Sequence, residues 1–397
     1  MKRILFVDDD DLLLEIYKVL LSGEEGRWEV STASGGAAAL KLMEARSFDV
    51  IATDMHMPGM NGAELLNAVV KRYSQTSRIM ISGVSDQAEV ARALGFTHQF
   101  IAKPVELDAL QAMLARLEGL DAFLNNEKLK SLAGQLRVLP SFPRLYFEIM
   151  KAIEAPETPL DTIDDLILQD PALTTKILQI ANSAALGMPE KIQDPRDAIR
   201  QLGLNTVRSL ALSAHVFASF TPAQKLNFPM ETLWGHLLAC GDTARLIMQL
   251  EDATPSEMEA AYTAGILHDI GKLMLADSLP DEFQTALMQA ATRPEPFHVI
   301  EQEIFGATHA GLAAYLLGLW GLPATIVEAV AFHHTPEKST HGKFSPLTAV
   351  HVANALEHEM DGGNGNVNEE YLASLGVATK LEVWREKIIN ARTDGDL

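Results

Sequence analysis

Near its start the chain reads Ile4-Leu5-Phe6-Val7-Asp8-Asp9, and this stretch decides the fold of its N-terminal part. An apolar run that contains β-branched residues predicts a buried strand, and two carboxylates follow it directly. Similar runs recur further along, so we place strands at 4–7, 28–32, 48–53, 78–82 and 99–102. Strands that alternate with helical segments predict an α/β doubly wound, five-stranded parallel sheet.

Segments with helical periodicity lie between these runs, and we expect helices at 12–21, 36–46, 63–73, 87–94 and 107–120. Apolar residues at helical spacing continue from Leu107 to Leu132, which predicts one helix leaving the sheet domain. Sheets of this kind place their functional sites at the carboxyl ends of the strands.

The composition excludes several classes of protein. The chain has 397 residues and a formal net charge of −21, from 32 Lys and Arg against 53 Asp and Glu. Such an acidic chain is repelled by phosphate backbones and anionic lipid, so we expect neither a nucleic-acid partner nor a membrane partner. The single cysteine, Cys240, excludes an intrachain disulfide and favours the reducing cytoplasm; we expect it to be a buried core residue.

The second part of the chain is predicted to be all-α. From about Asn125 the strand signal disappears, and helical segments are separated by Pro, Gly and capping residues. The uncharged stretch Ala310–Val327 is interpreted as two core helices around a Gly-Leu-Pro turn. We predict a first domain at 1–121, a helical linker at 122–138, an all-helical output domain at 139–360, and a flexible segment with a short helical tail at 361–397.

Polar residues follow the strands of the predicted sheet. Asp8 and Asp9 end the first strand, Asp54 the third and Ser82 the fourth, while Lys103 follows the fifth. Three converging carboxylates would repel one another unless they surround a cation, and Mg²⁺ fits their hard oxygens. We therefore predict that Asp54 is the nucleophile that accepts a phosphoryl group and that it holds the metal together with Asp8 and Asp9. Lys103 would neutralise the phosphoryl oxygens, and Ser82 would donate a hydrogen bond.

The stretch Asp54-Met55-His56-Met57-Pro58-Gly59-Met60-Asn61-Gly62, with the acidic pair and Lys103-Pro104, resembles the receiver domains of two-component signalling. The resemblance implies a flavodoxin-like fold and phosphorylation of Asp54 by a sensor histidine kinase or a phosphotransfer protein. It also implies that Phe100 is the aromatic residue that changes rotamer on phosphorylation. A cis bond before Pro104 would aim the lysine inward, and His56 has no role in the family.

Histidines gather in the second part of the chain, and imidazoles and carboxylates are ligands of Zn²⁺, Fe and Mn²⁺. The pattern resembles the HD superfamily of metal-dependent phosphohydrolases. Matched by position, His236 and His268-Asp269 take the places of the first metal ligands. His309 and His333-His334 take those of second-metal histidines in the branch that cleaves cyclic di-GMP. There are two departures: Asn354 stands at the final aspartate, and the Gly-Tyr-Pro motif is missing.

Earlier motifs resemble the HDOD family, the HD-related output domains. They are Leu139-Pro140-Ser141-Phe142-Pro143, Asp170-Pro171-Ala172-Leu173, Ala181-Asn182-Ser183-Ala184 and Ala198-Ile199-Arg200-Gln201-Leu202-Gly203. Members of this family are regarded largely as non-catalytic signalling modules that keep remnants of the HD site, so the resemblance implies a non-enzyme. We expect His215 and His298 to be hydrogen-bonded helix residues, and only one of His333 and His334 to face inward, because adjacent helical residues diverge by about 100°.

The sequence therefore predicts a response regulator of a two-component phosphorelay. Phosphorylation of Asp54 would control a non-catalytic HDOD domain that binds protein partners. The alternative is a metal-dependent phosphohydrolase that acts on a nucleotide or a cyclic dinucleotide. A transcription factor is disfavoured by the charge and by the lack of a basic helix-turn-helix. The cognate kinase, the downstream partner, the input signal and the oligomeric state, including a homodimer, stay open.

Overall fold

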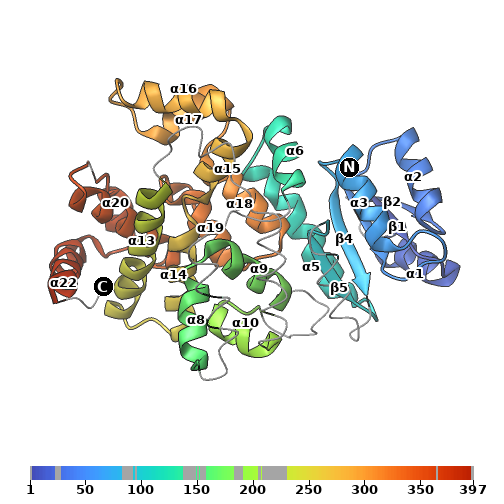
Figure 1. Cartoon of the computed structure of the whole chain (residues 1–397), viewed down its shortest axis with the longest axis horizontal. Helices are drawn as coiled ribbons and strands as arrows, with labels where there is room; N and C mark the ends of the chain where they lie inside the picture. The colour runs from blue at the N-terminus through green and yellow to red at the C-terminus, as the bar shows by residue number, and fades with distance from the viewer. Residues whose placement is uncertain are drawn as a thin grey trace. The chain divides into compact units, whose positions relative to one another are not determined.

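The computed structural model describes residues 2–22, 28–82, 96–136, 158–182, 191–203, 230–363 and 365–394, and the single residues 93, 149, 152 and 207. Its contacts divide the chain into two compact units (Figure 1). We call them the N-terminal unit, which includes residues 1–138, and the C-terminal unit, which includes most of residues 139–397. The motif 139–143, residues 183 and 184, His215 and most of the predicted helix 87–94 lie outside the described residues.

The N-terminal unit contains the predicted parallel sheet. Its strands are β1 (Lys2–Val7), β2 (Trp28–Ala33), β3 (Val50–Asp54), β4 (Ser77–Ser82) and β5 (Gln99–Ala102), in the order β2-β1-β3-β4-β5 (Figure 1). All four pairings are parallel. Every residue of β3 and β4 is buried, as expected for central strands covered on both faces. The predicted fold class is therefore confirmed.

Four described helices accompany these strands: α1 (Asp11–Ser22), α2 (Gly36–Ala45), α3 (Gly62–Arg72) and α5 (Leu107–Gly119). The start of α3 is closely specified by the sequence. Asn61 and Glu64 form a reciprocal capping box, in which each side chain accepts from the backbone N–H of the other residue. Gly62 lies against the end of β3, because a Cβ there would be 2.1 Å from the carbonyl oxygen of Asp54. This close approach fixes α3 beside the strand end that carries Asp54.

The prediction of one continuous helix from Leu107 to Leu132 is wrong. Helix α5 ends at Gly119, a 3₁₀ turn covers Leu120–Ala122, and α6 runs over Glu127–Gln135. The break has a local cause: the side chain of Asn126 accepts a hydrogen bond from the N–H of Leu129 and thereby starts a new helix.

Helix α6 is anchored within the N-terminal unit. The guanidinium of Arg78, a fully buried residue at the start of β4, donates to the carbonyl oxygens of Gly134 at 2.7 Å and of Phe96 at 2.6 Å. The hydroxyls of Ser74 and Ser131 lie 2.7 Å apart. A Cβ at Gly134 would lie only 1.9 Å from the carbonyl oxygen of Ser74, so glycine permits the contact. Helix α6 thus packs where β4 begins, at the end of the strands opposite to the one that carries Asp54.

The described residues of the C-terminal unit form helices and no strand, which agrees with the predicted all-α class. The helices are α8 (Leu160–Leu168), α9 (Pro171–Ala181), α10 (Pro195–Leu202), α13 (Met230–Leu250), α14 (Pro255–Leu267), α15 (Ile270–Ser278), α16 (Pro280–Ala290), α17 (Phe297–Phe305), α18 (His309–Leu319), α19 (Ala324–Phe332), α20 (Pro346–Met360), α21 (Glu369–Ser374) and α22 (Leu381–Asp394). Helices α18 and α19 are the two core helices expected around the Gly-Leu-Pro turn. Among the described residues, no helix combines the length and apolar character needed to cross a membrane.

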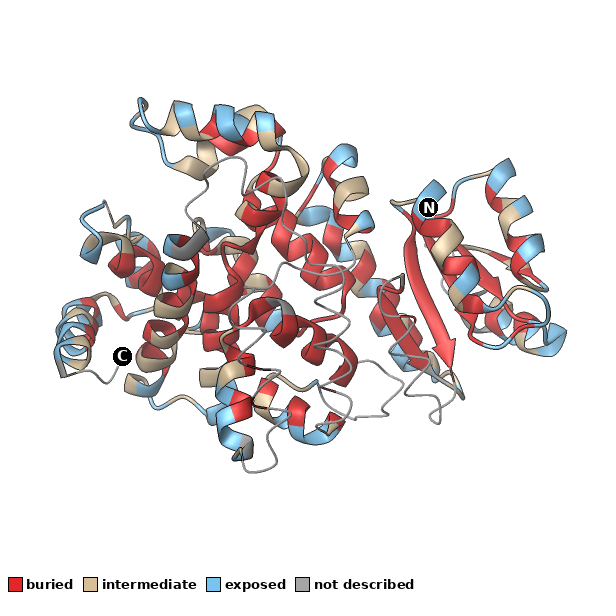
Figure 2. Cartoon of the chain, viewed as in Figure 1, coloured by how far each residue is buried: buried red, intermediate tan, exposed pale blue. Residues whose placement is uncertain are grey.

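The centre of the C-terminal unit is a buried group of helices, in which α13 packs against α14 and α20, and α19 packs against both α14 and α20. Figure 2 shows the burial concentrated there, whereas α16 and α22 carry many exposed residues. A Cβ at Gly265 of α14 would lie 2.6 Å from the Cα of Gly241 in α13. The two backbones therefore nearly touch, and this contact brings His236 of α13 close to His268, which follows α14.

The C-terminal tail packs back on this unit. The N–H of Asn368 donates to Nε2 of His351, and the indole N–H of Trp384 donates to Glu251 at 3.1 Å. Trp384 is almost fully buried, so α22 forms part of the core.

Candidate functional site

The first candidate site, where the sequence predicts a phosphoacceptor, lies at the carboxyl ends of the strands in the N-terminal unit. Carboxylate oxygens of Asp8, Asp9 and Asp54 lie within 4.8 Å of one another. Nζ of Lys103 is 2.5 Å from Oδ1 of Asp54 and 3.1 Å from Oδ2 of Asp8. Asp8 and Asp54 are buried, whereas Asp9 is exposed. The structure thus brings together the four charged residues that the sequence placed there.

The charges of this site suit a divalent cation. Burial alone would lower the pKa of Lys103, but hydrogen bonds to Asp54 and Asp8 outweigh it and raise the pKa, so the ammonium persists. Burial and the charge of Asp8 also raise the pKa of Tyr17 to about 12. Three carboxylates face this one ammonium, and hard oxygen ligands in excess of positive charge are what Mg²⁺ requires. The residues therefore fit the metal.

The other two predicted residues, Ser82 and Phe100, lie on the neighbouring strands β4 and β5. Ser82 is the last residue of β4 and pairs with Ala102, next to Lys103. Phe100 pairs with Met80 and is fully buried, so it lies two residues before the end of its strand rather than at the end. The bond between Lys103 and Pro104 is cis, as predicted. His56 is exposed, and its backbone N–H donates to Oδ2 of Asp54 at 3.0 Å.

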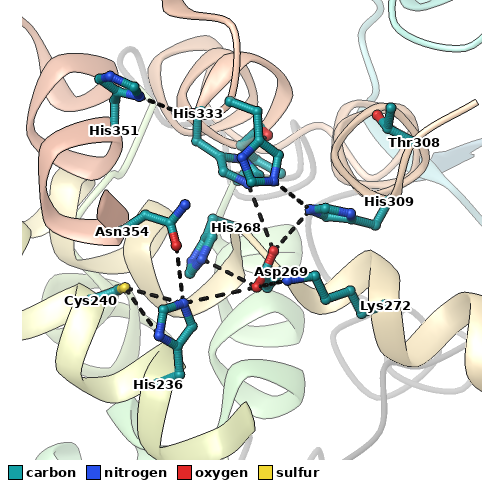
Figure 3. A network of polar contacts seen from close by, with 12 residues as sticks. His236, Cys240, His268, Asp269, Lys272, Thr308, His309, His333, His351 and Asn354 are labelled. Carbon is teal, nitrogen blue, oxygen red and sulfur yellow. Dashed lines mark hydrogen bonds and ion pairs between the residues drawn. The ribbon is translucent and has the colours of Figure 1, made fainter. Parts of the chain in front are cut away.

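The second site surrounds the carboxylate of Asp269, between α14 and α15 (Figure 3). Its Oδ1 lies 2.9 Å from Nε2 of His309 and 3.7 Å from Nε2 of His333. Its Oδ2 lies 3.5 Å from Nε2 of His268 and 3.9 Å from Nε2 of His236. Residues more than sixty positions apart in the sequence therefore converge on one carboxylate, as the resemblance implied.

Two of these imidazoles present a lone pair to the carboxylate. Nδ1 of His268 donates to the carbonyl oxygen of Gly265 at 2.6 Å, and Nδ1 of His333 donates to that of Val330 at 2.8 Å. Because Nδ1 carries the proton, each Nε2 is an acceptor. Both Nε2 atoms are buried without a hydrogen-bond partner among the residues that the structure describes. Buried acceptors that face a carboxylate are unfavourable unless a cation lies between them, so this donor set fits a divalent metal.

His309 is held between two carboxylates. Its Nδ1 donates to Oε2 of the fully buried Glu301 at 2.5 Å. Burial would lower the pKa of His309, but Glu301 and Asp269 outweigh it and raise the pKa. Glu301 is placed as the outer carboxylate that orients a metal-binding histidine through its second nitrogen.

The expectation that only one histidine of the pair faces inward is wrong. His333 and His334 both line the same cavity, their ring centroids are 4.0 Å apart, and Nε2 of His334 lies 3.2 Å from Nε2 of His309. The ring of His334 packs against those of His298 and His309, so contacts from other helices determine which way it faces. Burial lowers the pKa of both His333 and His334, which leaves them neutral and able to bind a metal.

Around His236 the donors differ in kind. Oδ1 of Asn354 lies 3.1 Å from Nε2 of His236, and Sγ of Cys240 lies 3.5 Å from the same atom. Burial and the neighbouring His268 lower the pKa of His236 to about 4. Asn354 therefore stands at the predicted place but offers a neutral amide oxygen. The thiol is buried, as expected for Cys240, and it also lies within reach of the histidines.

Several residues at this site were missed by the sequence reasoning. The ammonium of Lys272 contacts the carboxylate of Asp269. His298 lies in helix α17, as expected, and its ring also stacks on that of His334, with centroids 4.4 Å apart. The ring centroid of His358 lies 4.6 Å from that of His236. A signal existed for two of them, because Lys272 follows Asp269 by three residues and His358 follows Asn354 by four, which puts each pair on one helix face.

These residues line one side of a cavity of about 610 Å³ in the C-terminal unit. The polar side includes His236, Asp269, Lys272, His333 and Asn354. The apolar part of the lining comes from α16, α17 and their connection, and His298 of α17 adds a further imidazole. The apolar residues are Phe283, Leu287, Ala290, Pro294, Pro296 and Phe297.

Comparison with known families identifies two domains in the chain. The model of the response regulator receiver domain matches residues 4–115, and that of the HDOD domain matches residues 139–336. The chain is a response regulator with an HDOD domain. The first match covers the acidic residues, Ser82 and Lys103, and the second covers all the site histidines except His351 and His358.

Curated relatives resemble parts of this HDOD response regulator. An uncharacterized protein of Treponema pallidum is 29% identical over 235 residues, which are 58% of this chain and 44% of the relative. A protein-glutamate methylesterase/protein-glutamine glutaminase of Koribacter versatilis is 35% identical over 27% of this chain and 30% of its own length. The transcriptional regulatory protein MalR of Bacillus subtilis is 30% identical over 29% and 49%. The chain spans less than half of the length of each of these relatives.

Solved structures also resemble parts of this chain. The MmoQ response regulator of Methylococcus capsulatus is 25% identical and covers 61% of this chain and 97% of its own, with a TM-score of 0.48. An HDOD domain protein of unknown function from Geobacter sulfurreducens is 23% identical and covers 64% and 90%, with a TM-score of 0.40.

Proposed function

We propose that phosphorylation of Asp54 controls the HDOD domain of this response regulator, and that the HDOD domain acts without catalysis by binding a protein partner. The observation that carries the first part is the contact of Lys103 with both Asp54 and Asp8 beside three convergent carboxylates. Transfer forms a bond between phosphorus and a carboxylate oxygen of Asp54 and breaks the bond to the donor's histidine nitrogen. Lys103 and the Ser82 hydroxyl then stabilise the charge on the phosphoryl oxygens.

The partners follow from the domains. Receiver domains interact with histidine kinases or phosphotransfer proteins, and we propose such a phosphodonor here, with Mg²⁺ held by Asp8, Asp9 and Asp54. The net charge of −21 supports a protein rather than a nucleic acid or a membrane as the downstream partner. A single cysteine supports a cytoplasmic location. We also propose that the receiver domain covers residues 1–121 and that a helical linker covers 122–138. The HDOD domain would then cover 139–360, and a flexible segment with a short helical tail 361–397.

The direct test of the phosphoacceptor is labelling by a small phosphodonor in the presence of Mg²⁺. We expect label on the wild type and none on Asp54→Ala. His56→Ala is the matched control, because His56 is exposed two residues away and should take the label normally. Undiminished labelling of Asp54→Ala would reject the assignment.

A second candidate function is supported by the buried, unpartnered Nε2 atoms of His268 and His333. We infer that Asp269 and the surrounding histidines hold a divalent transition metal such as Fe, Mn or Zn. When bound, such an ion lowers the pKa of a coordinated water and thereby supplies a hydroxide. His309 and Glu301 would orient that site, and Lys272 would offset the charge of Asp269.

The neutral Asn354 argues against a full phosphohydrolase, because it replaces a carboxylate ligand. We expect protein supplied with Mn²⁺ or Fe²⁺ to cleave neither cyclic di-GMP nor other cyclic nucleotides at a useful rate. Robust turnover that His268→Ala abolishes would instead establish the hydrolase, while turnover retained in that variant would point to a contaminant.

A further inference from the structure

The cavity beside Asp269 has the size of a small-molecule site. Its volume of about 610 Å³ falls within the roughly 300–1,000 Å³ that is usual for such pockets. Its lining divides into the polar side described above and an apolar side, which we call the apolar wall: Phe283, Leu287, Ala290, Pro294, Pro296 and Phe297. A ligand that fills this cavity must therefore have a polar group for the polar side and an apolar group for the apolar wall.

The polar side favours an oxyanion once a metal is bound, and this step rests on the metal site proposed above. The carboxylate of Asp269 and the ammonium of Lys272 balance each other. The carboxylate of Asp361 also lines the cavity. A divalent ion held by Asp269 and the histidines outweighs this one further negative charge, so the polar side keeps a net positive charge. In a partly desolvated cavity this charge attracts an anionic head group that can also coordinate the metal.

The apolar wall favours a hydrocarbon group at the other end of the ligand. Phe283 is fully buried, and its ring meets that of Phe297 edge to face, with centroids 5.9 Å apart. This pair fixes the wall, and Leu287 extends it into the cavity. None of the six residues carries a charged or hydrogen-bonding side chain. Contact with the apolar wall therefore favours the binding of a hydrocarbon group over that of a hydroxyl group.

We propose that the HDOD cavity is a receptor site for a small amphiphilic oxyanion. The phosphate, phosphonate or carboxylate head binds at the metal, and the hydrocarbon body packs on the apolar wall. Such a ligand gives the response regulator a second input, independent of the phosphoryl group on Asp54.

A chain-length series tests the proposal on the full-length protein loaded with Mn²⁺. Calorimetry would compare methyl-, propyl- and hexylphosphonate, with acetate, butyrate and heptanoate as the carboxylate arm. Each methylene that enters the wall is worth about 0.8 kcal/mol, so affinity should rise about fourfold per added CH₂. The arm with the tighter binding identifies the head group.

Two neighbouring residues of α16 give a matched pair of variants. Leu287 lines the cavity, whereas Met288 is 60% exposed on the same helix. We expect Leu287→Asn to flatten the dependence on chain length and Met288→Asn to leave it unchanged. Loss of the dependence in both variants would contradict the role of the wall.

Mn²⁺ binding, followed by the spin resonance of the free ion, separates the two proposals. The carboxylates Asp8, Asp9 and Asp54 would also bind Mn²⁺, so the measurement compares the wild type with Asp269→Asn. If the wild type binds no more Mn²⁺ than this variant, the metal site is refuted and the receptor site falls with it. If Mn²⁺ binds but affinity is independent of chain length, or guanosine monophosphate binds more tightly than hexylphosphonate, only the receptor site is overturned.

Discussion

Single residues set the charge of the two sites in opposite ways. Around Asp54, carboxylates outnumber the one ammonium of Lys103. Around Asp269, a single carboxylate is enclosed by imidazoles, four of which lie within 3.9 Å of it. The first arrangement suits a hard, hydrated ion, and the second suits a transition metal, because nitrogen ligands favour the latter.

Asp9 is expected to serve as a metal ligand without a structural role, because its side chain is exposed at the end of β1. Asp9→Ala should weaken Mg²⁺ binding by about tenfold or more and slow phosphorylation of Asp54. Mg²⁺ titration followed by tryptophan fluorescence or calorimetry measures this, with circular dichroism as a check on the fold. An unchanged Mg²⁺ affinity would exclude Asp9 as a ligand.

The depressed pKa of His236 predicts acid sensitivity of the protein without added metal. The pKa is about 4 in the fold against an ordinary value of 6.5. Between these values the unfolded chain binds a proton that the folded chain does not, so the stabilisation is complete above pH 6.5 and is lost as the pH falls toward 4. The contribution of His236 to the free energy of unfolding should fall by up to about 1.4 kcal/mol per pH unit in this window.

Chelated protein unfolded by urea at a series of pH values measures this slope. His236→Gln is expected to be less dependent on pH than the wild type, since glutamine does not titrate. An equal slope in both proteins would show that other groups carry the acid sensitivity.

At the scale of helices and strands, the sequence pattern predicted those features that depend on neighbouring residues in the chain. The strand ends that carry Asp54, Ser82 and Lys103 were predictable because apolar runs stop at polar residues there. The connector was not, because its apolar spacing continues through the break while its packing depends on Arg78, far away in the sequence. The inward position of His334 was not predictable either, because its ring packs against His298 and His309, which lie elsewhere in the sequence.

Gly134 is expected to hold α6 on the N-terminal unit. In Gly134→Ala the new methyl group would lie 1.9 Å from the carbonyl oxygen of Ser74, so α6 must shift. The free energy of local opening of residues 127–135, measured by amide exchange, should fall by about 1–3 kcal/mol.

Gly119→Ala is the control for that variant. No atom lies within 4 Å of a Cβ at this end of α5, so alanine should be neutral or stabilise α5 by up to about 1 kcal/mol. Equal protection of α6 in the two variants would show that the packing on Ser74 does not hold the helix.

For the whole molecule, the architecture was predictable, and so was the convergence of His236, His268, His309 and His333 on Asp269. These residues lie on, or directly after, separate helices, and no rule of sequence spacing predicts that they meet. The resemblance of the motifs to a known family did predict it. The cavity and its apolar wall were not predictable in this way, because Phe283 and Leu287 read as ordinary core positions of an amphipathic helix. Only the structure shows that they line the same cavity as the histidines.

The central claim is that the state of Asp54 controls the HDOD domain, and coupling of this kind requires an element that the phosphoryl group shifts between two states. The candidates are Ser82, Phe100 and the segment 107–132, which joins β5 to α6. A Gly-Pro insertion between α5 and α6 should leave phosphorylation of Asp54 intact and remove any change in the HDOD domain.

Amide exchange of the full chain with and without a phosphoryl mimic and Mg²⁺ tests this claim most directly. We expect exchange to change in residues 107–132 and in helices of the C-terminal unit, and we expect no change in Asp54→Ala. A response confined to residues 1–105 would contradict the account and would leave the receiver domain as a docking or dimerisation device.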